Sequence, residues 1–102
     1  MIDLNYSFET ELWIYPAKVQ WYFITLPVDA SDEIKFFHKT RNGFGSVRVS
    51  ITIGTSNWKT SGFPSKEANS FIVPIKKEVR IKEGLAAGDL IAVDIHLAVD
   101  PF

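Results

Sequence analysis

Residues 46–53 read SVRVSITI, and this stretch decides the fold class. Its apolar side chains are those at the odd positions, namely Val47, Val49, Ile51 and Ile53. A period of two places all four on one face of an extended chain, which is typical of a strand with one buried side. Residues 54–57 read GTSN, which is turn chemistry, and residues 58–63 resume an extended pattern. The sequence therefore predicts a β-hairpin.

The turn sets the expected register of this hairpin. Whether the tip within residues 54–57 has two residues or four, we expect the inward pairs Ile53–Trp58, Ile51–Thr60 and Val49–Gly62. The same register gives the outward pairs Thr52–Lys59, Ser50–Ser61 and Arg48–Phe63. Residues 90–99 alternate in the same way, so both segments should contribute to one core, made of Val47, Val49, Ile51, Ile53, Trp58, Ile91, Val93, Ile95 and Leu97.

The remaining elements complete a mainly β fold. Alternating or β-branched runs predict further strands at residues 8–14, 19–26 and 71–74. Two short helices are expected, one from a cap at Asp29 or Ser31 to about residue 39, and one over residues 76–82 with its stop at Gly84. Five or six short strands with two helices favour a small closed β-barrel, which leaves no exposed strand edge. Residues 1–102 are expected to form this single domain.

Composition excludes several classes of protein. The chain is 46% hydrophobic and 23% charged, which is typical of a globular domain. It has no cysteine, which excludes a disulfide framework, a thiolate metal site and a cysteine nucleophile. Its start lacks a basic segment followed by an apolar one, and no apolar stretch reaches the ~20 residues of a membrane helix. We therefore expect a cytoplasmic protein without membrane partners.

A series of motifs resembles one known family. In order they read FETELW (8–13), WYFITLP (21–27), GFGSVRV (43–49), TIG (52–54), WKTS (58–61), PIKK (74–77) and EGLAAGD (83–89). The series resembles a small prokaryotic family known only as a domain of unknown function, sometimes fused to a bacteriocin-protection domain. The resemblance implies a double-split β-barrel, the fold of AbrB-type and MazE-type DNA-binding proteins. It implies no activity and no catalytic residue.

Charge is distributed unevenly along the chain. The net charge is −1, yet residues 34–82 hold ten of the eleven lysines and arginines and only two carboxylates. Two outcomes are open at this point. The acidic ends could fold beside the basic middle and cancel it, or the middle could form a positive face, with the candidates Arg48, Lys59, Lys76, Lys77, Arg80 and Lys82.

Neither a metal nor a cofactor is predicted. Asp94 and His96 lie on one face of the same predicted strand, but zinc needs three or four ligands. The glycines of residues 43–46 are followed by a strand, whereas a phosphate-binding loop opens a helix. No serine lies in a nucleophile elbow. We therefore predict no catalytic residue.

The outward face of the hairpin supplies a candidate ligand site. Arg48, Lys59 and Ser61 would combine cations with hydroxyl donors, which suits a phosphate or a carboxylate. Lys76 would join them if its strand pairs beside the hairpin, and Trp13 or Tyr15 would line the patch. A merely solvated strand face is the alternative.

Three function classes follow from these observations. The first is a non-enzymatic binding module for a small anion, a peptide or a partner protein, acting as a monomer or a homodimer. The second, nucleic-acid binding, rests on the basic middle and on the implied fold, and fold analogy is a weaker argument. The third, an enzyme of unknown reaction, has no motif in its favour.

Overall fold

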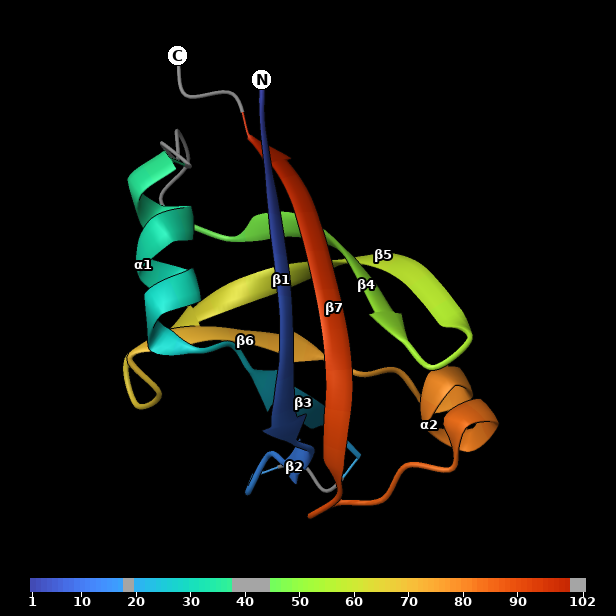
Figure 1. Ribbon diagram of the computed structural model, residues 1–102. Coiled ribbons are helices and arrows are strands. Elements are labelled where there is room, and N and C mark those ends of the chain that lie inside the picture. Colours follow the sequence, from blue (N-terminus) through green and yellow to red (C-terminus); the bar gives the residue numbers. More distant parts are fainter. Residues whose placement is uncertain (18–19, 38–44, 100–102) are drawn as a thin grey trace.

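The computed structural model describes residues 1–17, 20–37 and 45–99 and shows a mainly β chain (Figure 1). All strand pairings are antiparallel, in the order β1-β7-β4-β5-β6-β3-β2. The elements in chain order are β1 (Ile2–Glu11), β2 (Trp13–Ile14), β3 (Tyr22–Thr25), α1 (Val28–Phe37), β4 (Val47–Ile53), β5 (Ser56–Ser65), β6 (Ser70–Pro74), α2 (Lys77–Glu83) and β7 (Leu90–Val99).

The sheet curls into a half-barrel of seven strands, so the predicted closed barrel of five or six strands is wrong. Strand β5 makes the bend, because residues 56–62 pair with β4 and residues 63–65 pair with β6. As a result β1 and β7 cross over β5 and β6, and the core fills the space between them (Figure 1).

The barrel stays open because its two end strands follow one another in the chain. The sequence predicted one strand over residues 8–14, whereas β1 already starts at Ile2, ends at Glu11 and is separated from β2 by Leu12 alone. One residue cannot turn the chain back on itself, since a hairpin needs a loop of about two residues or more. Leu12 instead forms a buried corner, where its carbonyl accepts a 2.8 Å hydrogen bond from the Gly88 amide.

Side-chain hydrogen bonds connect β1 to α1 and to β3, with which β1 forms no strand pairing. The Tyr6 hydroxyl donates a 2.6 Å hydrogen bond to Glu33 on α1. The Thr10 hydroxyl donates to the Thr25 carbonyl of β3 at 3.1 Å. These contacts fix the curl of the sheet at two points.

The predicted core is confirmed. The odd-numbered side chains of β4 and β7 are buried, and Ile51 is completely inaccessible. Trp58, the ninth residue of the predicted set, is half-buried and packs on the same cluster. Helix α1 adds Ile34, and strands β3 and β6 add Ile24 and Val73.

The hairpin exists as predicted, but its register differs by two residues. Ile53 pairs with Ser56 rather than with Trp58, and Arg48 pairs with Ser61 rather than with Phe63. The reason is the position of the tip, which consists of Gly54 and Thr55 and lies one residue earlier in the chain than the predicted register requires. Gly54 takes a φ of +58° at the first turn position. A shift of two preserves the side-chain alternation, so the inward and outward faces are those predicted.

The helices agree in place with the prediction. Helix α1 begins at Val28, and Asp29 accepts a 2.9 Å hydrogen bond from the next amide. Ser31 caps nothing; it is buried and accepts a hydrogen bond from the Phe71 amide at 3.0 Å. Residues 38–39, the predicted end of α1, lie outside the described residues. Helix α2 stops at Gly84 in the left-handed conformation. No helix in the described ranges is long and apolar enough to span a membrane.

Candidate functional site

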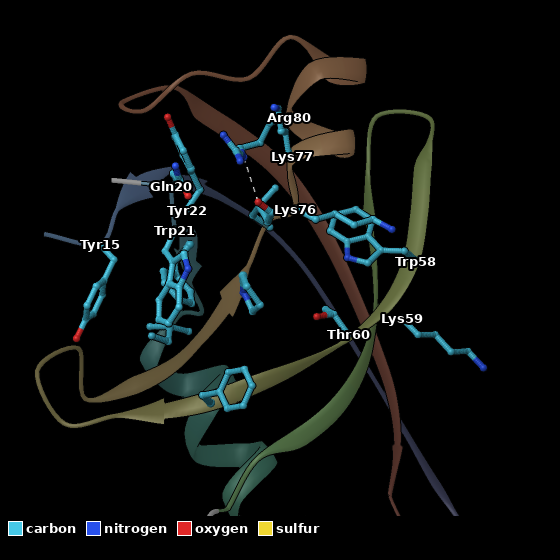
Figure 2. A pocket seen from close by; sticks show the side chains of 15 residues that line it. Tyr15, Gln20, Trp21, Tyr22, Trp58, Lys59, Thr60, Lys76, Lys77 and Arg80 are labelled. Atoms are coloured by element: carbon cyan, nitrogen blue, oxygen red, sulfur yellow. Dashed lines mark hydrogen bonds between the residues drawn. The ribbon is translucent and has the colours of Figure 1, made fainter. Parts of the chain in front are cut away.

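A groove of about 1120 Å³ lies where β3, β5 and β6 meet the start of α2 (Figure 2). Its floor is the sheet face turned away from the core, because the alternating partners Ile24 and Val73 point inward. Among the described residues the lining consists of Tyr15, Gln20, Trp21, Tyr22, Phe23, Trp58, Lys59, Thr60, Phe63, Ile72, Pro74, Ile75, Lys76, Lys77 and Arg80.

Six of the lining side chains are aromatic. Trp21, Phe63 and Tyr15 expose 52%, 44% and 39% of their surface, which is high for rings of this size. Tyr15 contacts two other rings of the lining, since its ring centre lies 6.0 Å from that of Trp21 and 6.1 Å from that of Phe23. The groove therefore offers flat apolar surface to a ligand.

Arg80 has a fixed position at one end of the groove (Figure 2). Its guanidinium carbon lies 3.7 Å from the centre of the Tyr22 ring, which is a close cation–π contact. Its Nε donates a 3.2 Å hydrogen bond to the Ile75 carbonyl. These two contacts use one face of the guanidinium and one donor. The terminal nitrogens keep their capacity for a bidentate acceptor.

Three lysines extend the positive charge around Arg80. Lys59, Lys76 and Lys77 are exposed, and the Lys76 ammonium lies 6.0 Å from the centre of the Trp58 ring. None of the described lining residues is an aspartate or a glutamate. Within the described ranges, the ion pair that the structure contains joins His96 to Asp3, on other strands. The carboxylates near the two ends of the chain therefore do not line this groove, and its net charge is positive.

The structure brings together half of the predicted ligand site. Tyr15, Lys59 and Lys76 line the groove, whereas Arg48, Ser61 and Trp13 do not. Arg48 does meet Ser61, since its Nη1 donates to the serine hydroxyl at 3.2 Å, but neither residue lines the groove.

Trp13 has a structural position instead. Its ring is half-buried and stacks on Phe23 at a centroid distance of 5.1 Å. Its Nε1 donates to the Thr25 hydroxyl at 3.0 Å. Trp13 therefore packs beside Phe23 on the same face of the sheet without lining the groove, while Tyr15 lines it.

Comparison with protein families shows how the chain is related to other proteins. Residues 8–95 match the family described as a domain of unknown function, DUF1905. The chain belongs to the DUF1905 family. The match includes every described lining residue of the groove, so the groove lies within the DUF1905 domain itself. The comparison with curated proteins finds no match.

A second, polar pocket of about 280 Å³ lies on the outer face of β1, β4 and β7. His96 Nε2 lies 3.1 Å from the Asp3 carboxylate, and Asp94 accepts a hydrogen bond from the Ser7 hydroxyl. Asp94 and His96 thus each have a separate partner. In the parts of the chain that the structure describes, no three histidines or carboxylates gather closely enough to hold a metal ion.

Five aromatic lining residues of the DUF1905 groove were not predicted as ligand contacts. Trp58 was expected in the core, and no ligand role was predicted for Trp21, Tyr22, Phe23 or Phe63. The sequence does contain a signal for this site. Basic side chains are concentrated at residues 76–80, and residues 21–23 are all aromatic. Only the pairing of β3 with β6 shows that these runs are neighbours in space.

Proposed function

We propose that this DUF1905 protein is a non-enzymatic binding module that holds an anionic ligand in the aromatic groove. The observation that carries the proposal is the set of four cations, Lys59, Lys76, Lys77 and Arg80, in a described lining without a carboxylate. The described lining also lacks an imidazole, and imidazoles and carboxylates are the usual general acids and bases. The groove chemistry therefore favours binding over catalysis.

Arg80 is the main anion contact in this proposal. A guanidinium presents its donors as a rigid fork that matches two oxygens of a phosphate or a carboxylate. The Tyr22 ring and the Ile75 carbonyl already hold that fork in one orientation. A ligand therefore orders few side-chain rotamers at this position, which favours affinity.

The proposal modifies the predicted site. Lys59, Lys76 and Tyr15 keep their proposed role, and Arg80 replaces Arg48 as the anion fork. The prokaryotic origin and the relationship to AbrB-type proteins stay predictions of the resemblance, and the cytoplasmic location stays a prediction from the sequence pattern. A homodimer is compatible with this proposal only if its interface leaves the groove accessible.

Binding of phenyl phosphate, a phosphate carrying one flat ring, tests the proposal. Trp21 and Trp58 line the groove, so a titration is followed by tryptophan fluorescence. We expect saturable binding that weakens about tenfold or more in Arg80→Ala, because hydrogen bonds to charged groups contribute about 1.5–3 kcal/mol. Arg80→Lys should recover only part of it, since lysine lacks the fork.

Arg48→Ala is the matched control. It removes the same charge from an exposed strand position outside the groove. Equal weakening by Arg48→Ala and Arg80→Ala would show that only the overall charge matters, and absence of saturable binding by the wild type would reject the groove as an anion site.

A further inference from the structure

We infer that the ligand of the groove is a single strand of nucleic acid, with unpaired bases on the aromatic rings and phosphates on the cations. This inference rests on the proposed function, because it requires that the groove binds anions. Proteins that bind single strands combine a positive groove with exposed rings on which successive bases stack. Both features occur here within one set of lining residues.

The rings of the groove lie at several positions along it. The exposed Tyr15 and Trp21 belong to the β2–β3 connection, and the half-buried Trp58 lies near the hairpin tip (Figure 2). The exposed Phe63 lies at the bend of β5. A free mononucleotide has one base and can use one of these positions. Several positions suit a ligand that presents one ring after another.

The cations are distributed in the same way. Lys76 lies over Trp58, and Arg80 lies over Tyr22, so two rings each carry a cation beside them. A nucleotide unit likewise places a charged phosphate next to a flat base. The groove volume of about 1120 Å³ is close to the upper end of the ~300–1,000 Å³ typical of sites for one small molecule, so it allows either kind of ligand. The repeated combination of rings and cations is what fits a short stretch of polymer.

The sheet topology disfavours an acidic peptide as the ligand. An extended peptide usually gains affinity by adding a strand to a free sheet edge. The floor strands β3 and β6 are each paired on both sides, whereas residues 56–62 of β5 pair with β4 alone. A peptide in the groove would therefore find free backbone groups only along this short part of β5, and none on the floor made by β3 and β6. A nucleic-acid strand needs none, because its contacts are stacking and charge.

Duplex nucleic acid is disfavoured by the same rings. Paired bases are stacked on one another inside the double helix, so Trp21 and Phe63 cannot reach their faces. An unpaired strand can splay its bases onto them. We therefore expect a strong preference for single strands over duplexes.

Fluorescence anisotropy with end-labelled oligothymidylate and oligouridylate of about twelve nucleotides tests the inference. This length lies within the ~4–16 nucleotides that one single-strand-binding OB-fold domain covers. A hairpin duplex and polyglutamate of matched charge are the comparison probes. We expect both single strands to bind more tightly than either comparison probe. The two sugars distinguish DNA from RNA as the source, because only RNA carries the 2′-hydroxyl.

Salt and ring variants separate charge from stacking. On a plot of log affinity against log salt, the slope should be no steeper than about −3, because four cations each contribute ~0.7. Trp21→Ala and Phe63→Ala should each weaken oligonucleotide binding by ~5- to ~150-fold with an unchanged slope. Phe36→Ala removes an exposed phenylalanine of α1 outside the groove and should change nothing. Circular dichroism and melting temperature check that each variant folds, and Tyr15→Ala replaces any variant that does not.

Each outcome has a distinct meaning. If phenyl phosphate binds and oligonucleotides bind no more tightly, the inference is wrong and the proposed function stands. If neither binds, both are wrong. Equal or tighter binding of polyglutamate identifies an acidic protein partner instead. A dimer in sedimentation that loses its stability in Trp21→Ala and Phe63→Ala identifies a second copy of this chain as the occupant.

Discussion

The Ser56 hydroxyl, at the start of β5, donates a 2.7 Å hydrogen bond to the carboxylate of Glu83, at the end of α2. Thr55 donates to the same carboxylate at 3.1 Å. A methyl group on Gly54 would lie 2.0 Å from a Glu83 oxygen, so a side chain at this position would displace the Glu83 carboxylate from the tip. Because α2 also carries Arg80, this contact determines where the anion fork lies relative to Trp58 in the hairpin.

Acid should weaken this contact. Hydrogen bonds from Ser56 and Thr55 hold the pKa of Glu83 below its ordinary value of 4.5. Such a group stabilises the fold above its unfolded-state pKa, and that stabilisation is lost as the pH falls through the lower folded-state pKa. We expect the urea midpoint of the wild type to fall more steeply below pH 4.5 than that of Glu83→Gln. Glu78→Gln, an exposed change on the same helix, is the control. Parallel pH profiles for all three proteins would contradict the prediction.

Alkali should weaken the contact between β1 and α1. Burial, together with the hydrogen bond to Glu33, raises the pKa of Tyr6 above its ordinary value of 10.0. The folded state then keeps a proton that the unfolded chain releases, so stability falls as the pH rises above 10. Tyr6→Phe cannot ionise and should lose less stability over that range, measured by urea unfolding at successive pH values. An equal loss in wild type and Tyr6→Phe would show that other groups cause it.

Removal of one buried hydroxyl should destabilise the contact between α1 and β6. The Phe71 amide donates to the Ser31 hydroxyl, Ser31 donates to Ser70, and Ser70 donates to the Leu26 carbonyl at 2.6 Å. Ser31→Ala leaves the Phe71 amide without its acceptor, so we expect a loss of about 1–3 kcal/mol in urea unfolding.

The double variant Ser31→Ala, Ser70→Ala provides the check on this network. The two serines share one hydrogen bond, so the combined loss should be smaller than the sum of the single losses. Strict additivity would show that the serines act independently.

A core substitution tests the packing between the two halves of the curled sheet. Ile51 is completely buried between β5 and β7, and Ile51→Ala should cost about 2–5 kcal/mol of unfolding free energy. Ile81→Ala, at a side chain that is 70% exposed, is the matched control and should cost far less. Similar losses at both positions would contradict the core assignment.

The sequence predicts correctly which side of each strand is buried, but it predicts poorly which residues of neighbouring strands pair with one another. The period of two at residues 46–53 identifies the buried side chains correctly, because alternation survives a register shift of two. The shift itself depends on the conformation of Gly54 at the tip, which the GTSN stretch does not specify. The same alternation is present at residues 2–8, so the early start of β1 could have been predicted.

The candidate site illustrates the other limit. Arg48, Lys59 and Ser61 do share one side of the hairpin by alternation, as predicted. Of these three residues, Lys59 lines the groove, whereas Arg48 and Ser61 lie outside it. The ring that positions Arg80 comes from Tyr22, on a strand far away in the sequence. Local periodicity carries no information about such a contact, because β3 reaches it only by pairing with β6.

The pairing of β1 with β7, from Ile2 opposite Val99 to Glu11 opposite Leu90, has a consequence for how the chain folds. During synthesis β1 is the first of these strands to leave the ribosome, and its ladder partner is the last. Contacts between such distant segments close a very long loop, and proteins rich in them fold slowly. Until then the apolar side of β1, with Leu4 and Phe8, has no ladder to hold it against the core. Completion of the half-barrel therefore waits for the final strand.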